Sequence, residues 1–223
     1  MDIKASISED HGIAVLTDDD LRVYSVGIST GGVAEIRMAE ANPKRHIIAT
    51  TIDKEGVEFA RKHVARKHLE GQIEAKIEDI AKPLPYSDGH FDYIYARLVL
   101  HYLPQDKLVA ALAELHRVLK PGGKLFVVVR STKCPDATRK EAHFDPITKL
   151  TTCTFTDTKT GKTHSYSRYF HTEQSISEHV ARAGFDVLYT KAFDERLYVD
   201  FMRTELSPKT DNVIELLAVN SER

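Results

Sequence analysis

The sequence predicts an α/β fold with a doubly wound, mostly parallel sheet. Between residues 21 and 130, apolar segments of strand length alternate with segments whose apolar residues follow a helical period. Such alternation is typical of a parallel sheet with helices on both faces. The segment LFVVV at 125–129 is apolar at every position, as expected for a strand that is buried on both faces of the sheet.

The first part of the chain supplies strands and helices in strict alternation. Asn42-Pro43 and Gly71 mark the places where the two helices stop. Apolar residues at alternate positions mark the third strand. The expected elements are strand 21–26, helix 33–41, strand 46–52, helix 55–68 and strand 73–77.

The later part continues the pattern and then changes it. Four leucines from Leu108 to Leu119 share one face of a helix, which Pro121-Gly122-Gly123 ends. Because no helix separates the last two strands, we expect an antiparallel edge to the sheet. The expected elements are strand 91–96, helix 108–119, strand 125–129, helix 176–183 and strands 185–193 and 212–220.

Residues 131–170 interrupt the alternation. Within them, CTFTDTKTGKTHSYSRYF predicts a β-hairpin that turns around Lys159-Thr160-Gly161. The insertion follows the carboxyl end of a strand, where such sheets bind ligands. It is therefore either a lid or a surface hairpin with no role in binding. With 223 residues, the whole chain (1–223) is expected to form one domain that includes it.

Composition argues against several classes of function. A net charge of −2 and a pI of about 6.6 are not those of a nucleic-acid-binding protein, and the basic segment 60–68 spreads its charge around a helix. No apolar run approaches the roughly 20 residues of a membrane span. Cys134 and Cys153 lack the spacing of zinc ligands. This spacing predicts no structural zinc, and we expect a protein without a metal. Because MDIKASISED lacks the apolar core of a secretion signal, we also expect a cytoplasmic protein. The sequence does not indicate an oligomeric state.

The segment SVGISTGG at 25–32 connects the first expected strand to the first expected helix, as in many nucleotide-binding sites. Gly27 to Gly31 matches the G-x-S-x-G elbow of serine hydrolases. That elbow needs an oxyanion donor from an earlier loop, and only about 20 residues precede the first strand. The segment also approximates the dinucleotide motif G-x-G-x-x-G, with Ser29 in place of the middle glycine that lets the backbone approach a pyrophosphate.

Three downstream segments favour another interpretation. The segments LPYSDGHFDYIYARLVLHYLP (84–104), ELHRVLKPGGKLFVVV (114–129) and ARAGFDVL (181–188) resemble segments of the class I S-adenosylmethionine (SAM)-dependent methyltransferases with small type-11-like domains. The resemblance covers roughly residues 21–220. It implies a Rossmann-like sheet of seven strands, SAM as the cofactor and methyl transfer as the activity.

The resemblance also implies a cofactor site, with substitutions in it. The family's loop reads D/E-x-G-x-G-x-G, and the corresponding positions here are Ser25, Gly27, Ser29 and Gly31. The leading acid and the middle glycine are therefore both replaced.

The family's ribose-binding acid falls on Thr51 when counted from Pro43, with Asp53 two residues further on. A neutral hydroxyl makes weaker hydrogen bonds than a carboxylate does. Asp79 matches the acid that receives the adenine amino group, and Ile80 would pack on the adenine ring.

Ala96 and Arg97 follow the fourth strand, where the sulfonium end of SAM is expected. Arg97 either binds an anionic substrate or pairs with a surface acid. A general base is needed only if the acceptor loses a proton before methylation. His101 and Tyr102 are the expected catalytic residues, among the available bases Tyr95, His101, Tyr102, His164, Tyr166 and His171.

The expected acceptor is a small molecule. The segment ARLVLHY (96–102) stands where DNA- and protein-amide-methylating relatives carry N/D-P-P-Y/F. Two alternatives remain. One is a catalytically silent binding protein of the same fold, in which Ser25→Asp with Ser29→Gly would create SAM affinity. The other is a nicotinamide-dinucleotide oxidoreductase.

Overall fold

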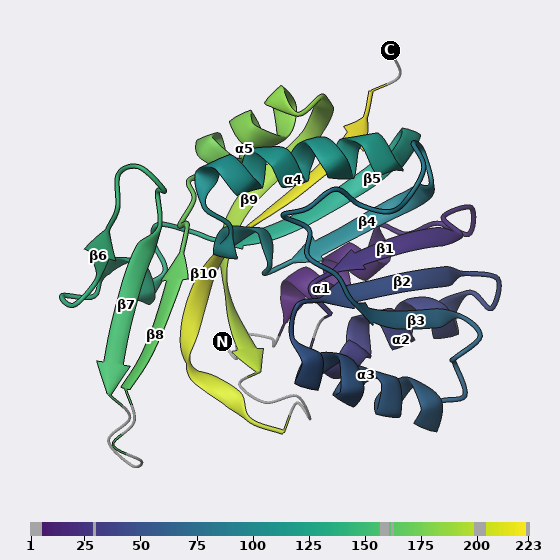
Figure 1. Ribbon diagram of the computed structural model, residues 1–223, viewed down its shortest axis with the longest axis horizontal. Coiled ribbons are helices and arrows are strands. Elements are labelled where there is room, and N and C mark those ends of the chain that lie inside the picture. Colours follow the sequence, from purple (N-terminus) through teal and green to yellow (C-terminus); the bar gives the residue numbers. More distant parts are fainter. Residues whose placement is uncertain (1–5, 29, 157–160, 162, 199–203, 222–223) are drawn as a thin grey trace.

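The structure is a computed structural model, and it describes residues 6–28, 30–156, 161, 163–198 and 204–221. Its main element is a sheet of seven strands in the order β3-β2-β1-β4-β5-β10-β9 (Figure 1). Strands β1 to β5 pair in parallel, whereas β10 pairs antiparallel with both β5 and β9. The strands are β1 Arg22–Val26, β2 His46–Thr51, β3 Ile73–Ile77, β4 Phe91–Arg97, β5 Leu119–Arg130, β9 Phe185–Tyr198 and β10 Leu206–Asn220.

This arrangement confirms the predicted doubly wound fold and the antiparallel pairing at one edge. The reversed strand is β10, which lies one position inside the edge strand β9. Helices cover both faces of the sheet, with α1, α2 and α3 on one face and α4 and α5 on the other (Figure 1). The helices are α1 Ile7–Ala14, α2 Val33–Ala41, α3 Lys54–Arg66, α4 Gln105–Val118 and α5 Glu173–Arg182.

Helix α1 was not expected, because it buries polar residues in place of an apolar stripe. Its buried residues are Ser8, Glu9 and Gly12. Gly12 permits a close approach to β4, since a Cβ atom there would lie 2.6 Å from the ring of Tyr95. The hydroxyl of Tyr93 donates a hydrogen bond of 2.7 Å to the Gly12 carbonyl. Neither contact produces a hydrophobic period in the sequence.

The core has two layers because successive strand residues point to opposite faces. Tyr24 and Ile94 pack in the layer that contains the leucines of α4. Val23 and Tyr93 pack in the layer that contains residues of α2. All four side chains are buried, so β1 and β4 are rigid central supports for whatever follows their carboxyl ends.

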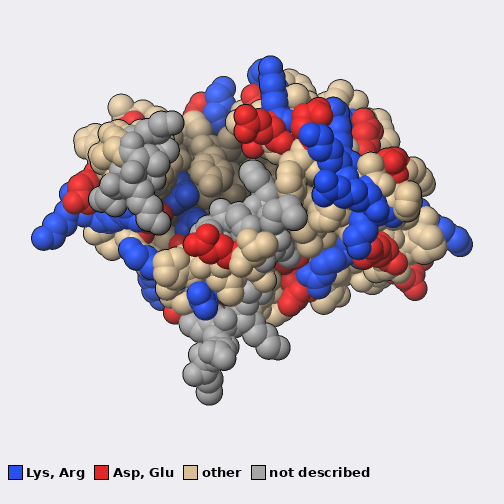
Figure 2. All heavy atoms as spheres, turned by 90° about the horizontal axis from the view of Figure 1, so that it is seen from below, with Lys and Arg blue, Asp and Glu red and all other residues tan. Residues whose placement is uncertain are grey.

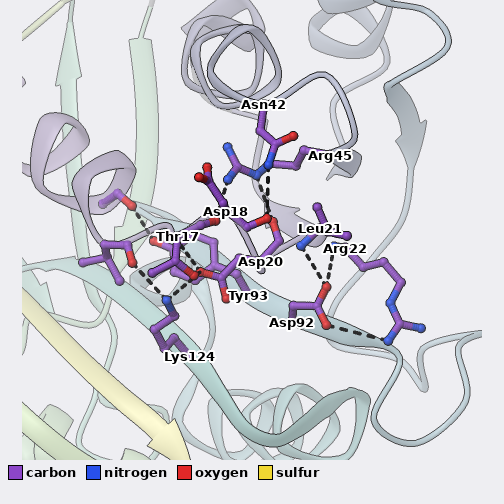
Figure 3. A network of polar contacts seen from close by, with 12 residues as sticks. Thr17, Asp18, Asp20, Leu21, Arg22, Asn42, Arg45, Asp92, Tyr93 and Lys124 are labelled. Atoms are coloured by element: carbon purple, nitrogen blue, oxygen red, sulfur yellow. Dashed lines mark hydrogen bonds and ion pairs between the residues drawn. The ribbon is translucent and has the colours of Figure 1, made fainter.

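A polar network closes the amino-terminal edge of the sheet (Figure 3). The buried guanidinium of Arg45 donates to the carbonyls of Asp20, Met38 and Thr17 at 2.9, 2.6 and 2.8 Å. Lys124 pairs with the Asp20 carboxylate at 2.5 Å. These contacts give the polar groups of this edge a structural role.

A second, three-stranded sheet follows β5 and stands beside β10 (Figure 1). It consists of β6 His143–Phe144, β7 Thr151–Thr156 and β8 Thr163–Arg168. The predicted hairpin is confirmed as β7 and β8, although Lys159 and Thr160 of its expected turn lie outside the described residues. Within the described part of the chain, no helix is both long and apolar enough to cross a membrane.

Candidate functional site

A pocket of about 420 Å³ opens at the carboxyl ends of β1, β2 and β3. Strand β1 lies between β2 and β4, so the chain order reverses direction here, which is where open α/β sheets bind ligands. We call this space the first pocket. It is lined by Val26, Gly27, Ile28, Thr50, Thr51, Ile52, Glu78, Asp79, Ile80, Leu98, Val99, Tyr102 and Leu103.

The glycine turn after β1 is held against the loop after β4. Gly27 has a φ of 73°, and a Cβ atom there would lie 2.8 Å from the Cβ of Val99. Glycine is therefore required at position 27. Gly31 also has a left-handed φ, of 69°, but it lies outside the lining of the first pocket, and its carbonyl accepts a hydrogen bond from the ring of His63. Ser29 lies outside the described residues.

A buried carboxylate lies beside the glycine turn where the sequence lacks the expected acid. The Ser25 hydroxyl donates a 2.5 Å hydrogen bond to Glu35, and both side chains are buried. Gly31 and Gly32, with φ values of 69° and 75°, turn the chain so sharply that the first turn of α2 faces the end of β1. Sequence reasoning missed Glu35, because an acid in the first turn of a helix normally stabilises that helix end and faces solvent.

The end of β2 brings Thr51 to the first pocket and leaves Asp53 outside its lining. The Asp53 carboxylate caps α3 by accepting the backbone N–H of Glu55 at 3.1 Å. A Cβ atom at Gly56 would lie 2.9 Å from that carboxylate, so the glycine gives the cap its room. The count from Pro43 therefore identifies the position at the pocket, and Asp53 has a structural role.

Glu78, Asp79 and Ile80 follow β3 and all line the first pocket. Glu78 accepts hydrogen bonds from the hydroxyls of Tyr24 at 2.5 Å and Tyr86 at 3.0 Å. Burial first, and then the Glu78 carboxylate, raise the pKa of Tyr24 above its usual range. Glu78 was not among the expected site residues. The sequence feature that could have identified Glu78 is its position at the end of a predicted strand, directly before Asp79.

The charged side chains that line the first pocket are all negative among the described residues. Its described lining contains the carboxylates of Glu78 and Asp79 and neither lysine nor arginine. Its other residues are mostly apolar, including Ile28, Ile80 and Val99. The pocket therefore suits a ligand with an apolar ring, hydrogen-bond donors and positive charge. A pyrophosphate, which carries negative charge, would meet no basic side chain among these residues.

A second pocket, of about 690 Å³, adjoins the first. The two share Leu98 and Tyr102 in their linings, and Figure 2 shows a hollow on the underside of the molecule with Lys or Arg side chains in its wall. The second pocket is lined by Ser6, Arg97, Leu98, His101, Tyr102, Arg130, Pro135, Asp136, Arg139, Tyr166, Arg168, Leu197, Tyr198, Ser207, Lys209 and Asp211. Because Tyr166 and Arg168 belong to β8, the inserted hairpin forms part of this wall.

The structure places Ala96 and Arg97 away from the first pocket. Ala96 is fully buried in the core layer beneath α4. Arg97 points to the other face, where its guanidinium donates to Ser8 at 2.7 Å and pairs with the buried Glu195 at 3.3 Å. Of the two roles considered for Arg97, pairing with an acid is the observed one, and that acid is internal. Leu98 and Val99, which follow Ala96 and Arg97 in the chain, line the first pocket.

His101 is fully buried at the wall of the second pocket. Both of its ring nitrogens lack a hydrogen-bond partner among the described residues. Burial, followed by the charges of Arg130 and Arg168 and the ring of His171, holds the pKa of His101 well below 6.5. The ring is therefore neutral near pH 7, with one nitrogen able to accept a proton.

Tyr102 lies between the two pockets, and its ring centre is 4.5 Å from that of His101. Of the other possible bases, Tyr166 lines the second pocket, and burial followed by Asp136 raises its pKa. Tyr95 and His171 are buried and line neither pocket. The side chain of His164 lies outside the described part of the structure.

The described residues contain no group of three metal-ligating side chains that is placed to hold an ion. Cys134 and Cys153 are both buried and free.

Residues 23–123 match a family model described as a methyltransferase domain. An uncharacterized methyltransferase of Synechocystis sp. is 28% identical over 99 residues, or 44% of this chain and 42% of that protein. The ubiquinone/menaquinone biosynthesis C-methyltransferase UbiE of Bradyrhizobium diazoefficiens is 29% identical over 115 residues, or 52% and 44% of the two chains. A 27-O-demethylrifamycin SV methyltransferase of Amycolatopsis mediterranei is 33% identical over 104 residues, or 47% and 36%. The matched part thus spans less than half of each relative.

Solved structures show the same fold over nearly the whole chain. A SAM-dependent methyltransferase from Methanosarcina mazei has a TM-score of 0.76 at 21% identity and covers 94% of this chain and 96% of its own. The [4+2]-cyclase SpnF has a TM-score of 0.65 at 18% identity, with coverages of 96% and 79%. At these identities the likeness concerns the fold alone, and the cyclase shows that the fold is not confined to proteins named as methyltransferases.

Proposed function

The chain belongs to the class I SAM-dependent methyltransferase family, with residues 23–123 as the part that matches the family's domain, and we propose that it transfers a methyl group from SAM to a small molecule. The observation that carries this proposal is the first pocket. It lies at the reversal point of the sheet, and its described charged lining residues are the carboxylates Glu78 and Asp79.

The residues of the first pocket fit SAM better than they fit a dinucleotide. Asp79 accepts from the adenine amino group and Ile80 packs on the ring. Thr51 and Glu78, at neighbouring strand ends, bind the ribose hydroxyls. Their proximity is supported by the hydrogen bond from the Glu78 amide to the Thr51 carbonyl, at 3.1 Å. In this way a carboxylate from β3 replaces the acid that is absent from the end of β2.

The chemistry that the cofactor supplies is a methyl carbon already activated by the positive sulfur to which it is attached. What this chain contributes is orientation and exclusion of water, and orientation alone lowers such barriers by about 7–11 kcal/mol. Where the acceptor must lose a proton, the neutral ring of His101 accepts it, and Tyr102 lies at the junction through which acceptor and methyl donor meet.

The acceptor is a small molecule bound in the second pocket. Its volume of about 690 Å³ is within the range of small-molecule sites. The names of two relatives support this class, since one is a ubiquinone/menaquinone biosynthesis C-methyltransferase and the other is a 27-O-demethylrifamycin SV methyltransferase.

Thermal unfolding with added ligands tests the cofactor assignment. S-adenosylhomocysteine at 100 times its dissociation constant is expected to stabilise the protein by about 2.7 kcal/mol, because it binds only the folded state. NADH at the same concentration is expected to leave the melting temperature unchanged. A shift with NADH and none with SAM or S-adenosylhomocysteine would instead establish the dinucleotide alternative.

The silent alternative is tested by following the methyl group. When the protein is incubated with methyl-labelled SAM and a small-molecule extract, we expect the label to appear on an acceptor in that extract. If SAM binds and no label leaves it under any of these conditions, the protein is a binding protein of this fold, as the substitutions at Ser25 and Thr51 alone would allow.

A further inference from the structure

We propose that the second pocket binds an acceptor that carries an anionic group, a carboxylate or a phosphate, and that Arg139 and Arg168 bind this group. The inference rests on the proposed function, because it specifies the acceptor of that activity. It makes the inserted hairpin, which supplies Arg168, a determinant of substrate choice.

Positive charge exceeds negative charge among the described residues of this wall. The charged residues that line the second pocket are the cations Arg97, Arg130, Arg139, Arg168 and Lys209 and the anions Asp136 and Asp211. Charges in a partly enclosed site interact more strongly than charges in open water. The pocket therefore attracts anions and disfavours cations.

Two of the arginines already have carboxylate partners of their own. Arg97 pairs with Glu195, which is fully buried behind it. Arg130 pairs with Asp211 and also contacts the thiol of Cys134. Their positive charges are largely balanced, and we assign them to the structure of the wall.

Arg139 and Arg168 share one carboxylate. The Nη1 atom of Arg168 lies 2.6 Å from one oxygen of Asp136, and the Nη2 atom of Arg139 lies 2.8 Å from the other. One negative charge thus faces two positive ones. The Nε–H of Arg168 is buried without a hydrogen-bond partner among the described residues, and Lys209 forms no ion pair with any of them. An anion between these side chains would supply the missing charge and acceptor atoms.

Arg168 is held in place by aromatic rings. Its guanidinium lies 4.2 Å from the ring centre of Tyr166 and 5.7 Å from that of Tyr102, distances typical of cation–π contacts. Because Tyr102 also lines the first pocket, an acceptor anchored at Arg168 has its uncharged part directed across Tyr102 toward the methyl donor.

The anchored anion would also act on His101. The positive charges of Arg130 and Arg168 contribute to its low pKa, so a bound anion that offsets Arg168 raises that pKa and makes the ring a stronger base. An acceptor of this class thereby improves the proton transfer that its own methylation needs.

Titration calorimetry on the intact protein saturated with S-adenosylhomocysteine tests the inference. The probes are benzoate and phenyl phosphate, with benzamide as the neutral match. We expect the two anions to bind and benzamide to bind at least about tenfold more weakly. The tighter of the two anions identifies the group as carboxylate or phosphate. Arg168→Gln and the more exposed Arg139→Gln are each expected to weaken anion binding by about tenfold to a hundredfold.

The control variant is Arg182→Gln, which removes an exposed arginine of α5 that pairs with Glu178 at 3.2 Å and lines neither pocket. It is expected to bind both anions as the parent does. Unchanged S-adenosylhomocysteine affinity in Arg139→Gln and Arg168→Gln shows that these variants are folded. If S-adenosylhomocysteine binds but the anions bind no better than benzamide at about 10 mM, the inference is overturned while the cofactor assignment stands. If S-adenosylhomocysteine itself does not bind, the proposed function fails first.

Discussion

Ser25 and Glu35 form a hydrogen bond of 2.5 Å beside the glycine turn, and neither side chain is exposed to solvent. Ser25 is the next-to-last residue of β1, where the resemblance implies an acid, and Glu35 brings a carboxylate to its side chain from the first turn of α2. A buried carboxylate therefore lies next to Ser25, although the sequence has no acid at position 25. This relationship alters what a reversion at position 25 would do.

Ser25→Asp is expected to destabilise the protein instead of improving cofactor binding. The new carboxylate would face Glu35 in a buried site, and an uncompensated buried charge costs about 3–5 kcal/mol. Urea unfolding of the variant measures this loss. The double variant Ser25→Asp/Glu35→Gln is expected to recover most of the stability, because it restores a single carboxylate. A single Ser25→Asp variant that is as stable as the parent would contradict the role given to Glu35.

Asp53→Ala and Asp79→Ala are expected to separate stability from cofactor binding. Asp53 caps α3 outside the pocket lining, so its removal should cost about 1 kcal/mol of unfolding free energy and leave S-adenosylhomocysteine affinity unchanged. Asp79 lines the first pocket, so its removal should weaken that affinity by about tenfold to a hundredfold. Calorimetry and urea unfolding of both variants give the two quantities. A loss of S-adenosylhomocysteine affinity in Asp53→Ala would instead show that Asp53 contacts the ribose.

Arg45→Met is expected to lower the unfolding free energy by about 3 kcal/mol. The change keeps a long apolar side chain but leaves three carbonyl acceptors without their buried donor (Figure 3). Arg22→Met is the matched control, since the Arg22 side chain is 51% exposed and pairs with Asp92 at 3.7 Å, and it should cost less than about 1 kcal/mol. Both variants should bind S-adenosylhomocysteine as the parent does, because this network lies at the opposite edge of the sheet.

Stability is expected to fall as the pH drops below 6.5, in part through His171. Burial, followed by the nearby His179, lowers the pKa of His171 to about 3. The His171 ring therefore takes up a proton near pH 6.5 in the unfolded chain but only near pH 3 in the folded chain. The contribution of the neutral ring to the free energy of unfolding is complete above pH 6.5 and is lost progressively between pH 6.5 and 3. By pH 5 the loss from this residue is about 2 kcal/mol.

Urea unfolding between pH 5 and 8 measures that slope. His171→Gln should flatten it, because the unfolded variant no longer gains the proton. An equal slope in the parent and His171→Gln would contradict the burial of a neutral ring at this position.

Much of the framework was predictable from local sequence. Helix 33–41 and strand 73–77 have the bounds that their patterns indicate. Thr51, to which the Pro43 count points, lines the first pocket together with Asp79 and Ile80, and their roles toward a cofactor stay predictions. Helix α1 was not predictable in this way, because its contacts with β4 and with Glu195 are made through glycine, serine and backbone groups.

The sequence by itself determined the order of strands and helices, the edge of the sheet at which the first pocket lies and the glycine turn at which that pocket begins. These features depend on periodicity and turn preferences that act over a few neighbouring residues. Only the tertiary structure decided which side chains meet there. Glu35 lies beside Ser25, Glu78 stands next to Thr51, and Arg139 and Arg168 share Asp136. Such pairings depend on how strands and loops distant in sequence pack together, and no local pattern records that packing.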